Sequence, residues 1–376
     1  MTNVRNDSAA PYAGDDDATA RTYYVGDNYD PETVRFFDVA HEGAQARSLK
    51  DSAADISSRV HGLSPRAIVV VALDHVAHAA AEFVTHKMAP LHQPLVVVDE
   101  LPKFVGPLDI VVVVGERADS DLALYGLITA NRRGATTIVL GPGRGQLIEE
   151  APEESLVIPT LPTAEGPSPV RYIAGLHMIL WALDHDLAVV ERRLEEIANA
   201  VDDELLALSP ERDASVNPGR KLREFCQGAR VIHSAQCRYV PVDYQPREIN
   251  IGPLVAQFAA TLWAARGIGG EYVASEELGF ALERQRHDQE ISTGGVPAVD
   301  DLFFDPFLDE EERSRGHVVP LKIVMWGSGE TDIAGCIAAD VVHTETLVSA
   351  PSGVSELIRA LRLITRAFAV TTYEIA

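Results

Sequence analysis

The sequence predicts an α/β protein built from two flavodoxin-like, doubly wound parallel sheets with helices on both faces. Three observations support this. Residues 67–72 (AIVVVA) and 109–114 (DIVVVV) are continuous apolar runs, which are typical of strands buried on both faces. Such runs alternate with stretches of helical periodicity, as crossover connections between parallel strands require. The pattern occurs twice in 376 residues, a length that predicts two domains.

The first half begins with a helix near Pro31, for which Asp30 is a plausible cap and Pro31 occupies the first turn. The remaining elements follow from apolar runs separated by turn residues. Strands are predicted at 67–72, 94–98, 109–114, 135–140 and 156–158, and helices at 74–88 and 119–132.

Two long helices, at 170–183 and 187–208, are predicted to link this half to a second one. In the second half the pattern predicts strands at 229–233, 271–274, 321–326 and 345–348, helices at 218–227, 253–265, 331–341 and 352–369, and a charged loop at 282–316. The chain is thus divided into a mobile acidic tail (1–30), a first domain (31–165), linking helices (166–216) and a second domain (217–376) that contains the 282–316 insertion.

Composition limits the function. The net charge of -24 repels phosphate backbones and anionic lipid, so we expect neither a nucleic acid nor a membrane as partner. The three cysteines form no CxxC pair and read as reduced thiols of a cytoplasmic protein. The first residues lack the apolar core of a signal peptide, and the longest apolar run, 172–183, is too short to span a bilayer.

Ligands of doubly wound sheets bind beyond the carboxyl ends of the strands, near the switch in strand order. The loops predicted to lie there are 73–77, 115–121, 141–145, 234–238 and 327–332.

Several stretches resemble the sugar isomerase (SIS) fold, and most closely the TobH-like actinobacterial branch of the bifunctional phosphoglucose/phosphomannose isomerases. The order of these stretches carries the resemblance over most of residues 35–376. They are GAQAR at 43–47, Arg133-Gly134-Ala135, SPVRYIAGLHMIL at 168–180, Asn217-Pro218 with Lys221-Leu222, DDLFFDP at 300–306 and the ending AFAVTTYEIA. The resemblance implies a sugar phosphate or related carbohydrate derivative as ligand, aldose–ketose isomerisation as the activity, a homodimer, and no cofactor.

The chain departs from the family at its functional turns. The family's hydroxyl-rich phosphate turn reads Gly115 to Ser120 here; only Ser120 carries a hydroxyl, and Glu116 and Asp119 would repel a phosphate. Arg171 is shifted by one position from the family's Pro-Arg pair. Three functions therefore stay open: a sugar-phosphate isomerase, a non-catalytic regulatory or scaffolding module that binds a sugar derivative, and a structural dimer subunit.

Isomerisation needs a base, an acid and an anion site. The candidates for acid–base catalysis are His75, His233, Glu248 and Glu330. The candidates for ligand contact are Asp74, Gly115, Arg117, Asp119, Ser120, Arg144, Arg171, Ser234, Gly327, Ser328 and Thr331.

Each candidate also has a purely structural interpretation. Asp119 or Ser120 can cap a helix, and the turns at 141–145 and 327–332 can be plain glycine turns. His75 and His78 have the spacing of metal ligands, but no third ligand follows, so no metal site is predicted.

Overall fold

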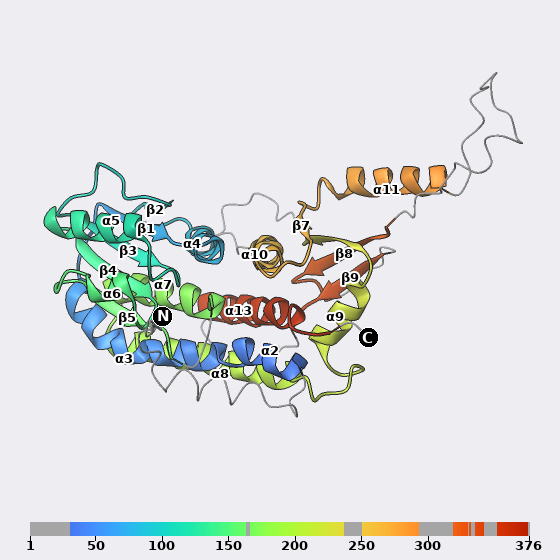
Figure 1. The fold of residues 1–376 in the computed structure, drawn as a ribbon, viewed down its shortest axis with the longest axis horizontal. Helices are drawn as coiled ribbons and strands as arrows, with labels where there is room; N and C mark the ends of the chain where they lie inside the picture. Colours follow the sequence, from blue (N-terminus) through green and yellow to red (C-terminus); the bar gives the residue numbers. More distant parts are fainter. Residues whose placement is uncertain are drawn as a thin grey trace, which may run out of the picture.

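The computed structural model describes residues 31–162, 166–236, 250–292, 319–329, 331, 335–341 and 352–374. Over these ranges the chain forms two parallel β-sheets with helices packed around them (Figure 1). The predicted α/β class and the parallel pairing are confirmed.

The first sheet has five strands in the order β2-β1-β3-β4-β5, with every neighbouring pair parallel. This is the flavodoxin-like order, in which the switch point lies between the first and third strands. Every residue of β1 and β3 is buried, which is why their sequences show no polar alternation. The strands are β1 (Ala67–Ala72), β2 (Leu95–Val98), β3 (Asp109–Val114), β4 (Thr136–Gly141) and β5 (Leu156–Pro159).

Helices cover both faces of this sheet. The outer face packs on α5 (Asp121–Arg132) and the short α6 (Gln146–Glu149). The inner face packs on α3 (Glu42–Val60), α4 (His75–Lys87) and α7 (Pro169–Asp184), while α2 (Pro31–Ala40) and α8 (Leu187–Leu208) lie next to α3. The helices α3 and α6 were not predicted.

The second sheet has four parallel strands in the order β7-β6-β8-β9, which repeats the strand order of the first sheet without its last strand. The strands are β6 (Arg230–Ser234), β7 (Glu271–Tyr272), β8 (Leu321–Trp326) and β9 (Cys336–Ala339). Its helices are α9 (Pro218–Cys226), α10 (Ile251–Ala265), α11 (Leu278–Ser292) and α13 (Ser352–Val370).

Two predictions for this half were wrong. The helix expected at 331–341 is replaced by β9, which starts only ten residues after the end of β8, and 282–292 of the expected loop is the end of α11. The tail at 1–30, the strand at 345–348 and the remainder of the insertion up to residue 316 lie outside the described residues.

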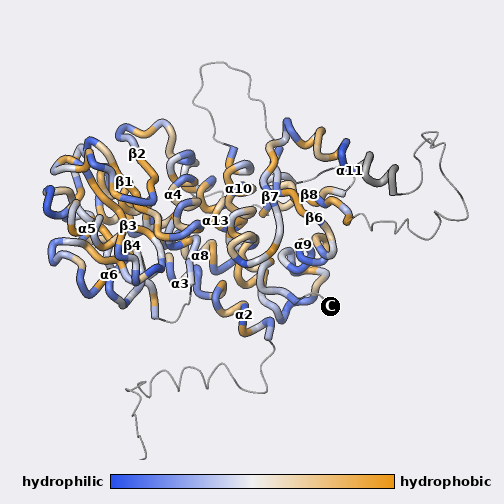
Figure 2. The backbone as a smooth tube through the Cα atoms, turned by 45° about the horizontal axis from the view of Figure 1, so that its top comes forward, coloured by the Kyte–Doolittle hydropathy of each residue, from blue (hydrophilic) through white to orange (hydrophobic). Residues whose placement is uncertain are grey.

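A single apolar core joins the two halves. It runs from the inner face of the first sheet through α7 and α13 to α10 and the inner face of the second sheet. In Figure 1, α4 and α10 lie side by side between the sheets, and the hydropathy colours of Figure 2 show apolar residues concentrated in the strands.

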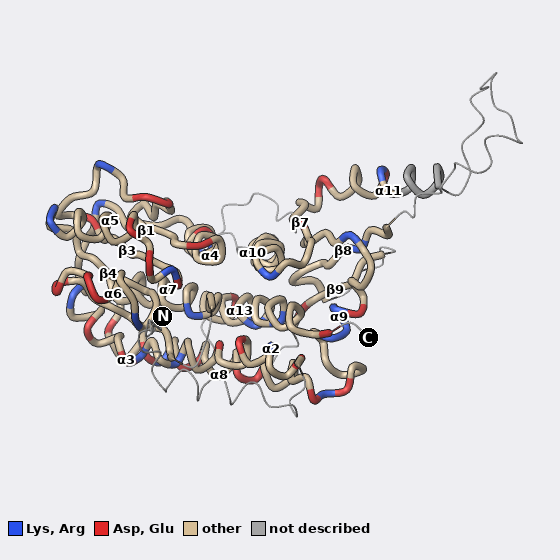
Figure 3. Tube along the Cα trace, viewed as in Figure 1, with Lys and Arg blue, Asp and Glu red and all other residues tan. Residues whose placement is uncertain are grey.

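Charged residues lie mainly on the helices and turns, while the strands are largely free of them (Figure 3). Within the described ranges, no helix combines the length and the apolar character needed to cross a bilayer.

Candidate functional site

Two carboxylates flank the switch point of the first sheet. Asp74 lies two residues beyond β1 and Glu116 two residues beyond β3, and these strands are paired up to Ala72 and Val114. The Glu116 N–H donates to Asp74 Oδ2 at 3.3 Å. The other oxygen, Oδ1, accepts from the N–H of Ala77 at 2.8 Å and caps α4. Asp74 is therefore fixed against the backbone of Glu116, where this fold binds ligands.

Gly115 permits this close approach. Its φ of +135° is a conformation that side chains disfavour, and a Cβ there would lie 2.7 Å from both Asp74 Oδ2 and Leu73 Cβ. The glycine is thus required by the geometry of the turn, which brings the backbone of β3 against the end of β1.

Glu116 is held by three donors on one oxygen. Its Oε1 accepts from Thr160 Oγ1 at 2.6 Å, Arg171 Nη1 at 3.3 Å and Tyr172 Oη at 3.4 Å. The side chain is 17 % exposed. Its Oε2 makes no hydrogen bond to the described part of the chain and is not a buried atom. Burial, reinforced by the Asp74 charge, raises the pKa of Glu116 despite these donors.

Arg171 connects the carboxyl ends of three strands from the first turn of α7. The side chain is completely buried; Nη2 donates to the carbonyl oxygens of Gly141 and Ile158, and Nη1 pairs with Glu116. The guanidinium group of Arg171 is therefore already paired with Glu116 and with backbone carbonyls at the ends of β4 and β5. We name Asp74, Glu116, Thr160, Arg171 and Tyr172 the switch-point cluster.

Behind this cluster, Glu42, the first residue of α3, is buried against the start of α7. Its Oε2 accepts from the Val170 N–H at 2.8 Å, and its carboxyl is also hydrogen-bonded to Ser168, the N-cap of that helix. Burial raises the pKa of Glu42 to about 8, with these bonds and Arg171 opposing the shift.

The predicted phosphate turn ends as an ordinary helix start. Ser120 is the N-cap of α5, and its hydroxyl oxygen accepts a hydrogen bond from the Ala123 N–H. In this structure Ser120 therefore acts as a helix cap. Arg117 and Asp119 are exposed. Arg144 is exposed on the neighbouring turn, whose Gly145 packs against Ala118. These side chains border the cluster without being part of it.

The second-half histidine is a core residue. His233 is fully buried; Nδ1 accepts from Trp326 Nε1–H at 3.0 Å, and the ring packs edge-on against Trp263. Burial lowers its pKa to about 3, so the ring is neutral at physiological pH and Nε2 carries its proton. Ser234 is also buried and donates to the Val273 carbonyl at 2.7 Å.

The carboxyl end of β8 is closely packed. A Cβ on Gly252, in the first turn of α10, would lie 2.7 Å from the Trp326 carbonyl oxygen, and Arg359 donates to the Gly327 carbonyl at 3.0 Å. Ser328 is buried and Thr331 half-buried. Among the described residues, the element that comes after β8 is β9, so they show no helix N-terminus at this turn that would favour an anion.

The remaining candidates are not gathered at one place. His75 is exposed in the first turn of α4, whereas Glu248 and Glu330 lie outside the described residues. The part of the chain that the structure describes holds no group of three or more potential metal ligands.

Sequence reasoning missed the roles of Glu42 and Thr160, and it considered Glu116 only as a residue that repels phosphate. One signal was available for Glu116: a carboxylate two residues after a fully buried strand, next to the expected switch point. No local pattern marks Glu42, because its partners come from α7, more than a hundred residues later.

No model of a known protein family matches this chain, and no curated protein matches it in sequence. Solved structures match this chain in their three-dimensional fold. The tagatose-6-phosphate ketose/aldose isomerase of Escherichia coli is 10% identical with a TM-score of 0.51, over 91% of this chain and 95% of that one. The C-terminal domain of glucosamine-fructose-6-phosphate aminotransferase from Francisella tularensis is 11% identical with a TM-score of 0.50, over 92% and 97%. At this identity the likeness concerns architecture, and the chain has the two-sheet fold of sugar isomerase (SIS) domains.

Proposed function

We propose that this protein binds a carbohydrate derivative at the carboxyl edge of its first sheet, without isomerising it. The observation that carries the proposal is the pair of carboxylates at the switch point, Asp74 and Glu116, of which Glu116 keeps Oε2 open to a ligand. Carboxylate oxygens accept hydrogen bonds from sugar hydroxyls, and charge-assisted bonds of this kind are the strong ones.

The charges at the edge favour contacts with hydroxyl or amino groups over contacts with a phosphate. Asp74 contacts Glu116 in the turn that leads to α5, whose first turn also carries Asp121 and whose cap is already filled by Ser120. Arg171, the cation of the cluster, is completely buried and paired. Among the described residues of these turns, the exposed Arg117 and Arg144 remain as cations for a ligand phosphate.

A second candidate function, aldose–ketose isomerisation, is supported by the raised pKa of Glu116. A carboxylate whose pKa is shifted toward neutrality suits a base that moves a proton between sugar carbons. The described residues provide no equally well-placed acid, because His233 is sequestered between tryptophans and His75 is exposed on α4. We therefore place this function second.

Calorimetric titration of the full chain tests the binding proposal with matched pairs of ligands: glucose against glucose 6-phosphate, mannose against mannose 6-phosphate, and glucosamine against glucosamine 6-phosphate. At least one sugar should bind, and the unphosphorylated or amino member should bind more tightly than its phosphate. Glu116→Gln should weaken that binding about tenfold, because it replaces a charged acceptor by a neutral one. The exposed Glu211→Gln is the matched control and should bind as the parent does.

The same preparation decides between the two functions. Incubation with fructose 6-phosphate should yield no glucose or mannose 6-phosphate. Turnover that Glu116→Gln abolishes would establish the isomerase instead. Failure of every sugar and sugar phosphate to bind would contradict both functions.

The finer assignments belong to the same proposal. The stretches that resemble the phosphoglucose/phosphomannose branch support membership of it, with a first domain at 31–165 and a second at 217–376. We propose a cytoplasmic homodimer, and light scattering after size-exclusion chromatography tests the dimer.

A further inference from the structure

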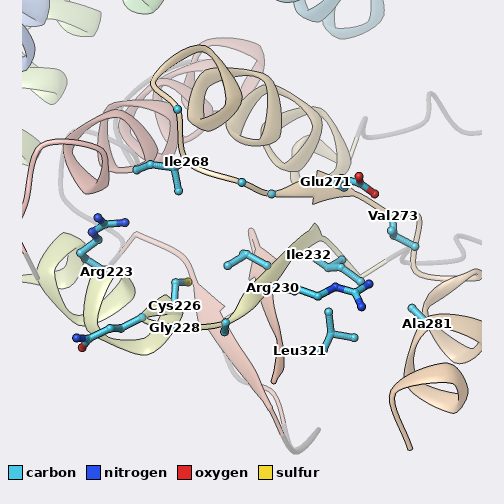
Figure 4. Close-up of a pocket in the computed structure, with 16 residues that line it drawn as sticks. Arg223, Cys226, Gly228, Arg230, Ile232, Ile268, Glu271, Val273, Ala281 and Leu321 are labelled. Atoms are coloured by element: carbon cyan, nitrogen blue, oxygen red, sulfur yellow. The ribbon is translucent and has the colours of Figure 1, made fainter. Parts of the chain in front are cut away.

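A cavity of about 660 Å³ lies at the amino edge of the second sheet, whereas the switch-point cluster lies at the carboxyl edge of the first sheet. Figure 4 shows it between the start of β6 and the stretch that leads into β7, with α9 on one side and α11 on the other. Its size is within the range of small-molecule sites in proteins. Because it lies where the strands begin, it is separate from the switch-point cluster of the first sheet.

The cavity exists because β7 is short. β7 pairs with β6 only at Ile232 and His233, so the residues before these pairs separate from the neighbouring chain. One wall is the start of β6, and the other is the stretch from Gly267 to Gly270 that follows α10. Three of these four residues are glycines, so ligand atoms can approach the backbone closely.

Two arginines line the cavity and lie at its opposite ends in Figure 4. Arg223 is half-buried, and its Nε donates to the Tyr373 carbonyl at 3.3 Å. Neither Arg223 nor Arg230 forms an ion pair with any residue of the described ranges. Burial lowers the pKa of Arg223, because its charge is partly desolvated without a carboxylate beside it.

The rest of the lining combines aliphatic side chains and glycines with one carboxylate, the amide of Gln227 and the thiol of Cys226. Ile232, Ile268, Val273 and Leu321 contribute aliphatic surface between the arginines, and Glu271 lies at the rim. The net charge of the lining side chains is therefore positive in a protein whose net charge is -24. Such a combination fits a molecule with an apolar body and a negatively charged group.

We propose that this amino-edge cavity is a second binding site, which takes a small organic anion with an apolar body. Arg230, at the start of β6, supplies the donors for the acidic group, Arg223 adds a positive charge at the other end of the cavity, and the aliphatic wall contacts the body of the molecule. This site is separate from the proposed carbohydrate site. It lies at the amino edge of the second sheet and carries arginines, whereas the carbohydrate site lies at the carboxyl edge of the first sheet and carries carboxylates.

The full chain should bind anilinonaphthalene sulfonate, an aromatic anion, saturably and with one equivalent per chain in a fluorescence titration. Arg230→Gln should weaken this binding about tenfold, as expected for loss of a charge-assisted hydrogen bond. Arg132→Gln on α5 removes the same charge from an exposed position in the first half and should change nothing. Phenylnaphthylamine, the same aromatic frame without the sulfonate, should bind equally to the parent chain and to Arg230→Gln.

Circular dichroism must first show that each variant is folded, and Arg223→Gln provides an independent second variant. Saturable binding that neither arginine substitution weakens would overturn the proposal, as would the absence of one-equivalent binding to the folded parent. Glu116→Gln should leave the titration unchanged, so failure at the carbohydrate site and failure at this cavity are distinguishable.

Discussion

At the scale of single residues, several buried polar side chains make contacts between elements that are far apart in the sequence. Glu42, Arg171, His233 and Glu204 are all at most 1 % exposed, and every one of them contacts an element distant in sequence. A buried charge is stable only when it is paired or neutralised. Arg171 and Glu204 are paired, whereas Glu42 and His233 are kept neutral by shifted pKa values.

Glu42 gives the chain a pH-dependent stability of known sign. Its carboxyl ionises near 4.5 in the unfolded chain and at about 8 in the folded one. Between these pH values the native state holds one more proton, so this group's contribution is complete below pH 4.5 and is lost as the pH rises toward 8. The loss is at most about 1.4 kcal/mol per pH unit.

Glu42→Gln keeps an acceptor for Val170 but cannot ionise. Urea unfolding from pH 5 to pH 8 should therefore show the variant gaining stability relative to the parent as the pH rises. Other titrating groups cancel in this difference, and Glu211→Gln should show no such trend. A difference that stays constant over the range would mean that Glu42 is already ionised in the folded protein.

At the scale of elements, the sequence predicted best what depends on local pattern. β1 and β3 are buried along their whole length and β8 over its last four residues. Each has a short apolar run in the sequence, so all three were located within a residue. The helix α3 was missed because its buried side mixes Gly43, Gln45 and Ser57 with apolar residues, and such a face has no clear periodicity.

The exchange of a helix for β9 has a different cause. Residues 336–339 (CIAA) are short, apolar and compatible with either state, and pairing with β8 selects the strand. The same reason bears on the glycine-rich turn at 327–332, since the helix expected to follow it is not found in the described residues 335–341. Contacts such as Arg171 with three strand ends likewise depend on the folded topology alone.

The turn between β3 and α5 is expected to tolerate no side chain at Gly115. Gly115→Ala places a Cβ 2.7 Å from Asp74 and Leu73 at a φ of +135°, so it should destabilise the protein by about 2 kcal/mol. Gly106→Ala is the matched control, since nothing lies within 4 Å of its Cβ, and it should change stability by less than about 0.5 kcal/mol. Equal effects of the two substitutions in urea unfolding would show that the turn relaxes.

At the scale of the whole molecule, the two sheets share one core, and a buried ion-pair network reinforces it. Glu204 on α8 pairs with Arg362 and Arg366 on α13 at 3.1 and 2.8 Å, and Arg366 also donates to the Asp340 carbonyl at the end of β9. The helix that links the halves is thus tied to the last helix and to the second sheet. We expect the halves to unfold together.

Far-UV circular dichroism, which reports all helices, and tryptophan fluorescence from Trp181, Trp263 and Trp326 should give coincident urea transitions. Glu204→Gln leaves two buried arginines short of a counter-charge and should shift both curves together, by about 3 kcal/mol. Glu195→Gln, on the same helix but in a surface pair with Arg47 and Lys50, should cost less than about 1 kcal/mol.

The shape of the transitions discriminates between two ways of holding the halves. If the shared core dominates, even Glu204→Gln unfolds in one step, because Ile179 of α7 and Ile364 of α13 remain buried in the same cluster. If the ion pairs were the main link, the variant would show two separated transitions, with fluorescence preceding circular dichroism. The continuity of the core across α7, α13 and α10 leads us to expect the single step.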